Sequence, residues 1–322
     1  MRFTLPTFLA PLLTLAAPAV ADPVLVQPID CTLGESCYIQ HYVDRDAGPL
    51  VQDYGCGSLS YDGHKGTDFA LRSLNQMAEG VDILAAAPGV VRGVRDGMAD
   101  RIYTIDTAAE VEGRECGNGV AIDHGGGWIS QYCHMKQGSV VVERGQRVAA
   151  NAVLGQVGLS GKTQFPHLHI SLRQNGEVTD PFGPKAETCN AEPTDTLWQD
   201  TPPYQAGGLI DAGFAIRVPE YTEIKAGDAH VHQLDQSAPA LVGWAYGYGT
   251  LKGDVMQITL SGPAGTVIDK RILLKKSQAQ MFRAVGRRRP DGGWDAGHYR
   301  AVAKLIRKGE VVDQREVWLD LR

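Results

Sequence analysis

The sequence lacks features that would point to several common classes of protein. It has no long basic tract, its formal net charge is −6, and the short cluster at 287–289 is typical of a solvated turn, so nucleic acid is not an expected partner. Beyond the N-terminus no apolar run approaches the ~20 residues of a membrane-spanning helix, so no membrane span is expected. No Cys-x-x-Cys pair occurs, which argues against a metal site made of cysteines.

The N-terminus has the pattern of a secretory signal peptide over residues 1–21. Arg2 precedes an apolar run over 3–18, and Ala19-Val20-Ala21 supplies the small residues of a cleavage site before Asp22. No cysteine follows that site, so a lipid anchor is not expected. The mature chain is therefore predicted to be exported and soluble.

The six cysteines suit an exported chain, because an even number in that compartment favours disulfides. A hairpin centred on the glycines near 125 would pair 120–123 with 129–132. It would bring Cys133 close to Cys116, and we predict that bond. The connectivity of the other four stays open; plausible pairs are Cys31–Cys37 and Cys56–Cys189.

Histidines and one aspartate form a separated set of motifs. His64 and Asp68 lie in Gly-His-Lys-Gly-Thr-Asp, His167 and His169 lie in Pro-His-Leu-His, and His134 follows Tyr-Cys between them. Two imidazoles and one carboxylate are the ligands that a catalytic zinc ion needs, since such sites keep a fourth position for water. The motifs predict a hydrolytic metal site.

Local periodicity predicts how these motifs are displayed. Residues 165–172 alternate as a strand with His167, His169 and Ser171 on one face and apolar residues on the other. Residues 128–134 also alternate, which predicts a shared face for Ser130, Tyr132 and His134. Glycines flanking His64 argue against a helix there, so we expect a loop that enters a strand at 68–71.

Other histidines are not expected to take part. His230 and His232 form a second His-x-His, but no companion motif accompanies them, so a solvated strand face is predicted. His124 is expected in a hairpin turn, and His41 and His298 are expected to be ordinary surface residues or hydrogen-bonded core residues.

In this order the motifs resemble those of the lysostaphin/LytM-type zinc metallopeptidases, which cut peptide bonds in bacterial cell walls. The resemblance covers roughly residues 55–185, and the matching segments are 64–68, 118–128, 132–135, 145–148, 154–158, 160–163 and 166–169. The stretch 96–116 departs from the family as an insertion between two strands.

The resemblance implies a role for each residue of the set. His64, Asp68 and His169 would be the ligands of one Zn2+, and His134 and His167 would be catalytic histidines that do not bind the metal. No ligand position is substituted, which argues against the non-catalytic members of the group. Because the sequence has no His-Glu-x-x-His motif, a histidine is the expected proton acceptor.

The resemblance therefore implies an exported zinc metalloendopeptidase, most simply periplasmic and otherwise secreted or wall-associated. Its substrate would be the stem peptides or cross-links of peptidoglycan. The alternative is a non-hydrolytic wall-associated protein that binds peptide or activates another wall hydrolase. The intact ligand set favours the enzyme.

The expected fold is mainly β, since short strands alternate with glycine-rich turns throughout. A LytM-like antiparallel catalytic domain is predicted over 22–190, a Pro- and Thr-containing linker over 191–208, and a small β-sandwich, immunoglobulin-like in plan, over 209–322. The last domain would position the enzyme or bind a wall or protein partner. Three of its aromatic residues alternate along one segment: Trp244, Tyr246 and Tyr248. They could form a surface that stacks on glycans, although packing in a core is the commoner role of such a pattern.

Overall fold

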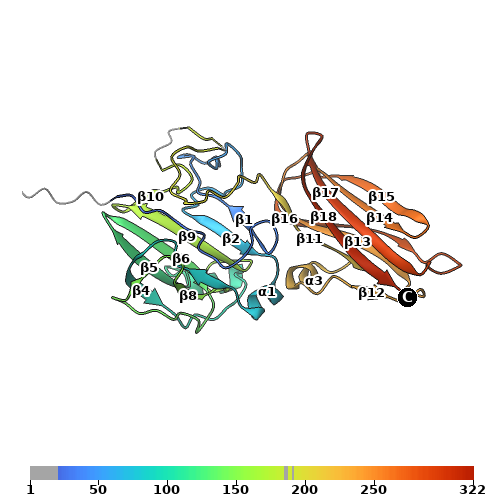
Figure 1. Ribbon diagram of the computed structural model, residues 1–322, viewed down its shortest axis with the longest axis horizontal. Helices are drawn as coiled ribbons and strands as arrows, with labels where there is room; N and C mark the ends of the chain where they lie inside the picture. Colours follow the sequence, from blue (N-terminus) through green and yellow to red (C-terminus); the bar gives the residue numbers. More distant parts are fainter. Residues whose placement is uncertain (1–20, 185–187, 191) are drawn as a thin grey trace, which may run out of the picture.

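The computed structural model describes residues 21–184, 188–190 and 192–322 and consists mainly of β-strands (Figure 1). Nearly all of the predicted signal peptide lies outside the described residues. Within them, no helix is both long and apolar enough to cross a membrane. Two β regions lie side by side: the first β region holds β1 to β10, and the second β region holds β11 to β18 (Figure 1).

The first β region is built on an antiparallel sheet of eight strands. Their order is β1-β2-β9-β6-β5-β4-β7, with β10 paired to β9. These strands are β1 (Cys37–His41), β2 (Thr67–Leu71), β4 (Gly89–Arg95), β5 (Asn118–Gly125), β6 (Trp128–Met135), β7 (Arg147–Val148), β9 (His167–Gln174) and β10 (Glu177–Thr179). The remaining elements are the paired strands β3 (Asp82–Leu84) and β8 (Val153–Gln156), and the helices α1 (Leu74–Glu79), η1 (Ile105–Thr107) and α2 (Ala108–Val111).

The central strand β9 shows the alternation expected from the sequence. Leu168, Ile170 and Leu172 are buried in the core, while His169 faces the paired residue Asp68 on β2. Apolar burial on one face stabilises the sheet and leaves the other face for polar residues. The antiparallel β architecture predicted for this part of the chain is confirmed.

The hairpin of β5 and β6 has the predicted register, with Val120 opposite Tyr132 and Asp123 opposite Ile129. The predicted Cys116–Cys133 disulfide is present. The two pairs regarded as plausible are present as well: Cys31–Cys37 and Cys56–Cys189.

The prediction that Ser130, Tyr132 and His134 share a face is wrong for His134. Ser130 and Tyr132 are hydrogen-bonded to each other in the core. At the end of β6 the register with β5 shifts, so that Cys133 and His134 together oppose one residue, and His134 has a φ of 62°. Such a bulge breaks the two-residue alternation and re-aims a side chain. It directs the ring of His134 towards His167 instead.

The second β region contains two sheets. One has the order β11-β13-β16, and the other has the order β12-β18-β17-β14-β15. The elements are β11 (Gly208–Ala215), α3 (Tyr221–Ala226), β12 (Gln233–Leu234), β13 (Ala240–Thr250), β14 (Val255–Gly262), β15 (Gly265–Leu273), β16 (Gln278–Arg288), β17 (Gly297–Arg307) and β18 (Glu310–Leu321). Apolar side chains such as Leu241, Ile258 and Leu305 fill the core that they share.

The aromatic stripe of β13 is buried, as core packing requires. Trp244, Tyr246 and Tyr248 have exposed fractions of 2%, 3% and 2%. They belong to the hydrophobic core of the first β region, and the rings of Tyr248 and Tyr38 on β1 lie 4.4 Å apart. The stripe therefore joins the two β regions and is not a surface for stacking glycans.

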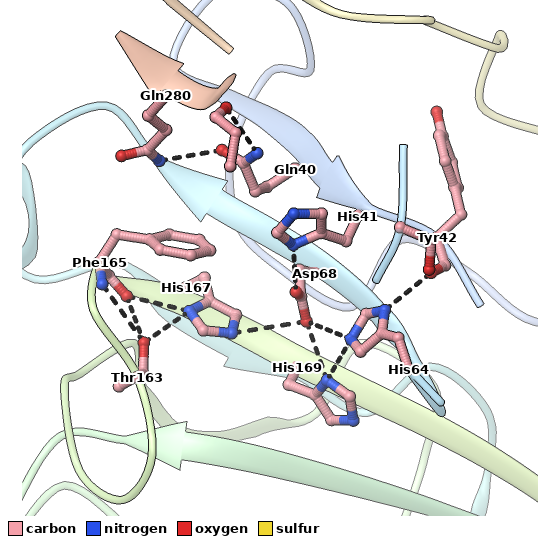
Figure 2. Close-up of polar contacts among 12 residues, drawn as sticks. Gln40, His41, Tyr42, His64, Asp68, Thr163, Phe165, His167, His169 and Gln280 are labelled. Carbon is pink, nitrogen blue, oxygen red and sulfur yellow. Dashed lines mark hydrogen bonds and ion pairs between the residues drawn. The ribbon is translucent and has the colours of Figure 1, made fainter. Parts of the chain in front are cut away.

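Polar contacts reinforce this junction beside β1. Gln280 on β16 donates through Nε2 to Gln40 Oε1 at 2.9 Å (Figure 2). The same nitrogen donates to the Tyr38 hydroxyl at 3.0 Å. Arg72 forms an ion pair with Asp211 of β11. Buried aromatic contacts and these bonds fix the second β region against β1, the strand paired with β2.

Candidate metal centre

Three side chains from two distant parts of the sequence bring one donor atom each to the same point (Figure 2). His64 Nε2 lies 3.2 Å from Asp68 Oδ1 and 3.1 Å from His169 Nδ1. Asp68 Oδ1 lies 2.8 Å from His169 Nδ1. Tetrahedral zinc ligands with bonds of ~2.0–2.1 Å stand about 3.3 Å apart. The donor set and its spacing therefore fit a zinc ion and leave a fourth position for water.

The sheet and one backbone carbonyl set the directions of these donors. Asp68 on β2 is directly opposite His169 on β9, so both side chains project from the same face. His64 lies in the loop before β2, and its Nδ1 donates to the Tyr42 carbonyl at 2.7 Å. That bond places the free lone pair of the imidazole on Nε2, the atom that faces the other two donors.

Gly66 allows the loop to pass over the site. A Cβ atom at this position would lie 2.5 Å from the Ile170 carbonyl oxygen and 2.6 Å from His169 Nε2. Real Cβ atoms do not approach that closely, so only glycine fits at position 66 without moving the His169 ring.

His134 and His167 lie beside the three donors, with their ring centroids 4.7 Å apart. His134 Nδ1 donates to the Ser160 carbonyl at 2.8 Å. His167 Nδ1 donates to the Phe165 carbonyl at 2.9 Å, and its Nε2 lies 3.4 Å from Asp68 Oδ1. All five residues that the sequence singled out thus meet on one face of the sheet.

The electrostatics keep one of these residues negatively charged and another neutral. Burial and the neighbouring imidazoles lower the pKa of His134 well below its ordinary value. Burial alone would raise the pKa of Asp68, but the charges of His64 and His167 outweigh it and hold the pKa of that carboxyl well below its usual range. At neutral pH the site therefore offers a carboxylate to a metal ion and a neutral imidazole to a proton.

His41 is the functional neighbour that sequence reasoning missed. It was expected to be an ordinary surface or hydrogen-bonded core residue, and it is half-buried with Nδ1 3.1 Å from Asp68 Oδ2 (Figure 2). Its position follows from the pairing of β1 with β2, which sets His41 opposite Asp68. A lone histidine in a strand carries no signal of that pairing.

The insertion at 96–116 borders the His167 side of the site. It lies between β4 and β5 and contains η1 and α2. The backbone N–H of Tyr103 donates to the Thr163 carbonyl at 2.8 Å, and Thr163 Oγ1 is 3.1 Å from His167 Nδ1. The insertion therefore supports the loop that orients this histidine.

The second His-x-His pair is not on a strand, contrary to the prediction. His230 and His232 lie in a loop that precedes β12. The backbone N–H of Phe214 donates to His230 Nδ1 at 3.0 Å and holds this loop beside β11. His230 is half-buried and His232 is exposed.

A family model described as Peptidase family M23 matches residues 62–181. This segment includes all five residues of the site. Over this segment the chain is similar to the metallopeptidases of family M23, and the segment carries the three side chains of the candidate metal site.

Individual relatives cover the chain in part. An uncharacterized metalloprotease of Buchnera aphidicola subsp. Baizongia pistaciae is 27% identical over 126 residues, which are 39% of this chain and 27% of that protein. The peptidoglycan DD-endopeptidase ShyA of Vibrio cholerae serotype O1 is 30% identical over 113 residues, which are 35% of this chain and 21% of that protein. The chain thus spans about a quarter of the length of these relatives.

Solved structures also resemble this chain. The catalytic domain of the antimicrobial peptidase lysostaphin from Staphylococcus simulans is 20% identical, with a TM-score of 0.28, over 44% of this chain and 85% of that one.

Proposed function

We propose that this protein is an exported zinc metalloendopeptidase that hydrolyses peptide bonds in the stem peptides or cross-links of peptidoglycan. The observation that carries the proposal is the convergence of His64 Nε2, Asp68 Oδ1 and His169 Nδ1, which forms a three-donor site for zinc. The M23 match and the similarity to a peptidoglycan endopeptidase support the reaction and the substrate class.

His64, Asp68 and His169 would hold a single Zn2+. When bound, the ion supplies a water whose pKa falls from ~15.7 towards ~7 and a Lewis acid for the scissile carbonyl. The protein's own contribution is to fix the donors in place. The Tyr42 carbonyl orients His64, and His41 holds the outer oxygen of Asp68.

His134 and His167 together would transfer protons and stabilise the developing oxyanion. His134 is neutral, and because its Nδ1–H is engaged by the Ser160 carbonyl, Nε2 is the nitrogen that can accept a proton. The Phe165 carbonyl engages Nδ1 of His167 in the same way, so its Nε2 faces the donor cluster.

The proposal also covers the cellular compartment and the second β region. Three disulfides are typical of extracytoplasmic proteins and support export to the periplasm. The strand order β11-β13-β16 facing β12-β18-β17-β14-β15 supports an immunoglobulin-like accessory domain. The proposed limits are 22–190 for the catalytic domain, 191–208 for the linker and 209–322 for the accessory domain, with a wall or protein partner for the last.

The test is turnover of defined, cross-linked peptidoglycan fragments by the purified, zinc-loaded chain from Asp22 onward. Mass spectrometry of the products identifies the bond that is cut. Wild type should convert the fragments, and His169→Ala should lose both the bound zinc and the activity. His134→Ala should keep the zinc and lose about 10²- to 10⁴-fold in kcat.

If the wild-type chain binds one zinc ion yet leaves every fragment intact, the proposal that it is a hydrolase is overturned. Binding of the same fragments without turnover would instead identify a wall-associated binding protein. Equal turnover by wild type and His134→Ala would remove His134 from the proposed mechanism while leaving the metal site in place.

A further inference from the structure

A cleft of about 200 Å³ lies where the two β regions meet, at the side of β1. The first β region lines it with Gln40, His41 and the segment 58–60. The second β region lines it with the end of β13 and the residue that follows (249–251) and with residues 277–279, where β16 begins. It is therefore a cleft that neither β region forms alone.

The cleft continues the face that carries the metal donors. His169 on β9, Asp68 on β2 and His41 on β1 are opposite one another on successive strands, so their side chains form a row across one face of the sheet. His41 ends the row: its Nδ1 contacts Asp68 at 3.1 Å, and the residue also lines the cleft. A chain lying across the donors would enter the cleft next.

The lining selects by charge. Apart from His41, no ionisable side chain lines the cleft; amides and hydroxyls do, with Ser58, Ser277 and Gln278 among them. Charged groups lose their hydration in such a place without gaining a partner, whereas peptide groups find donors and acceptors.

We infer that this cleft is a subsite for a neutral peptide segment on one side of the scissile bond. The inference rests on the proposed function and extends it, because it gives the second β region a part in substrate selection. The wall contributed by that region is firmly held: Gln40 Nε2 donates to the Ala279 carbonyl at 3.1 Å, and Gln280 donates to Gln40 Oε1 at 2.9 Å (Figure 2).

The test fills the cleft from the side of the second β region. Ala279 is exposed and lines the cleft, so Ala279→Trp places an indole in it while leaving the metal donors untouched. Ala296→Trp is the matched control, since Ala296 is an exposed alanine of the same β region outside the cleft. Both variants should bind one zinc ion with wild-type affinity.

Binding and turnover are measured separately. The binding probe is N-acetylated, C-amidated tetra-alanine, titrated calorimetrically into the zinc-loaded chain, with the corresponding tetra-glutamate as the charged comparison. Wild type and Ala296→Trp should bind tetra-alanine and not tetra-glutamate, and Ala279→Trp should bind it at least about tenfold more weakly. In turnover of peptidoglycan fragments, Ala279→Trp should lose kcat/KM by a similar factor.

The inference is overturned if wild type does not bind tetra-alanine, or if Ala279→Trp binds and cleaves as wild type does. Failure of the proposed function looks different. In that case wild type cleaves no fragment, yet tetra-alanine still binds and Ala279→Trp still weakens its binding.

Discussion

His41 Nδ1 lies 3.1 Å from Asp68 Oδ2, while Oδ1 of the same carboxylate faces the other two metal donors. The bond comes from the pairing of β1 with β2, which sets the two residues opposite each other. One oxygen of Asp68 is thus held by the protein, so that the other is presented to the metal in one orientation. Hydrogen bonds of this kind to metal-binding carboxylates tune metal affinity.

We therefore expect His41→Ala to weaken zinc binding by about 10- to 100-fold, because Asp68 would lose the bond that orients it. His41→Asn should keep most of the affinity, since the side-chain amide can donate from nearly the position of Nδ1. The measurement is competition for zinc against a chromophoric chelator of known affinity. Equal affinities for wild type and His41→Ala would show that the bond does not position Asp68.

Gly66→Ala should damage the same site from another direction. The added methyl group would lie 2.6 Å from His169 Nε2 and 2.5 Å from the Ile170 carbonyl oxygen, so the imidazole or the strand must move. We expect zinc affinity to fall by at least about tenfold, as it does when a hydrogen bond to a metal-binding residue is lost. Gly93→Ala is the control, because nothing lies within 4 Å of a Cβ atom at that position. Unchanged affinity in Gly66→Ala would contradict the steric argument.

The stability of the zinc-free chain should depend on His134 in mildly acidic solution. Its pKa is lowered well below the ordinary value, chiefly by burial, so the folded state keeps it neutral where the unfolded state protonates it. Below about pH 6.5 the unfolded state then binds more protons, and this residue costs up to about 1.4 kcal/mol of stability per pH unit. The loss stops growing, and stays at its full value, once the pH falls below the lowered pKa.

Denaturant unfolding of the zinc-free wild type and of His134→Gln, at several values between pH 7.5 and 5, measures this contribution. Wild type should lose stability more steeply than His134→Gln as pH falls, because the other titrating groups are common to both proteins. Parallel profiles would mean that His134 is not held neutral by the fold.

Much of the site could be predicted from sequence because its chemistry is concentrated in short motifs. His64, Asp68 and His169 are recognisable from residue type and order, and the glycine turn of β5–β6 is local enough to give the register and the Cys116–Cys133 bond. These features depend on neighbours along the chain, which the sequence displays.

The remaining features depend on pairings that local patterns do not encode. The direction of His134 depends on a bulge against β5, so simple alternation assigned it to the wrong face. The contact of His41 with Asp68 depends on the pairing of two strands separated by a long loop. Trp244 was expected in a core, but only the assembled structure reveals that this core lies between the two β regions.

The disulfides allow a prediction about stability in which loop length decides the order. Cys56–Cys189 spans 133 residues and Cys31–Cys37 spans 6, so the first removes far more freedom from the unfolded chain. The chain-entropy relation gives about 5 kcal/mol for the long loop and about 2 kcal/mol for the short one. The double variant Cys56→Ser/Cys189→Ser should therefore unfold at lower denaturant concentration than Cys31→Ser/Cys37→Ser, with zinc bound in both. The reverse order would show that the Cys31–Cys37 bond acts in the folded state, where it closes the loop leading into β1 and so towards His41.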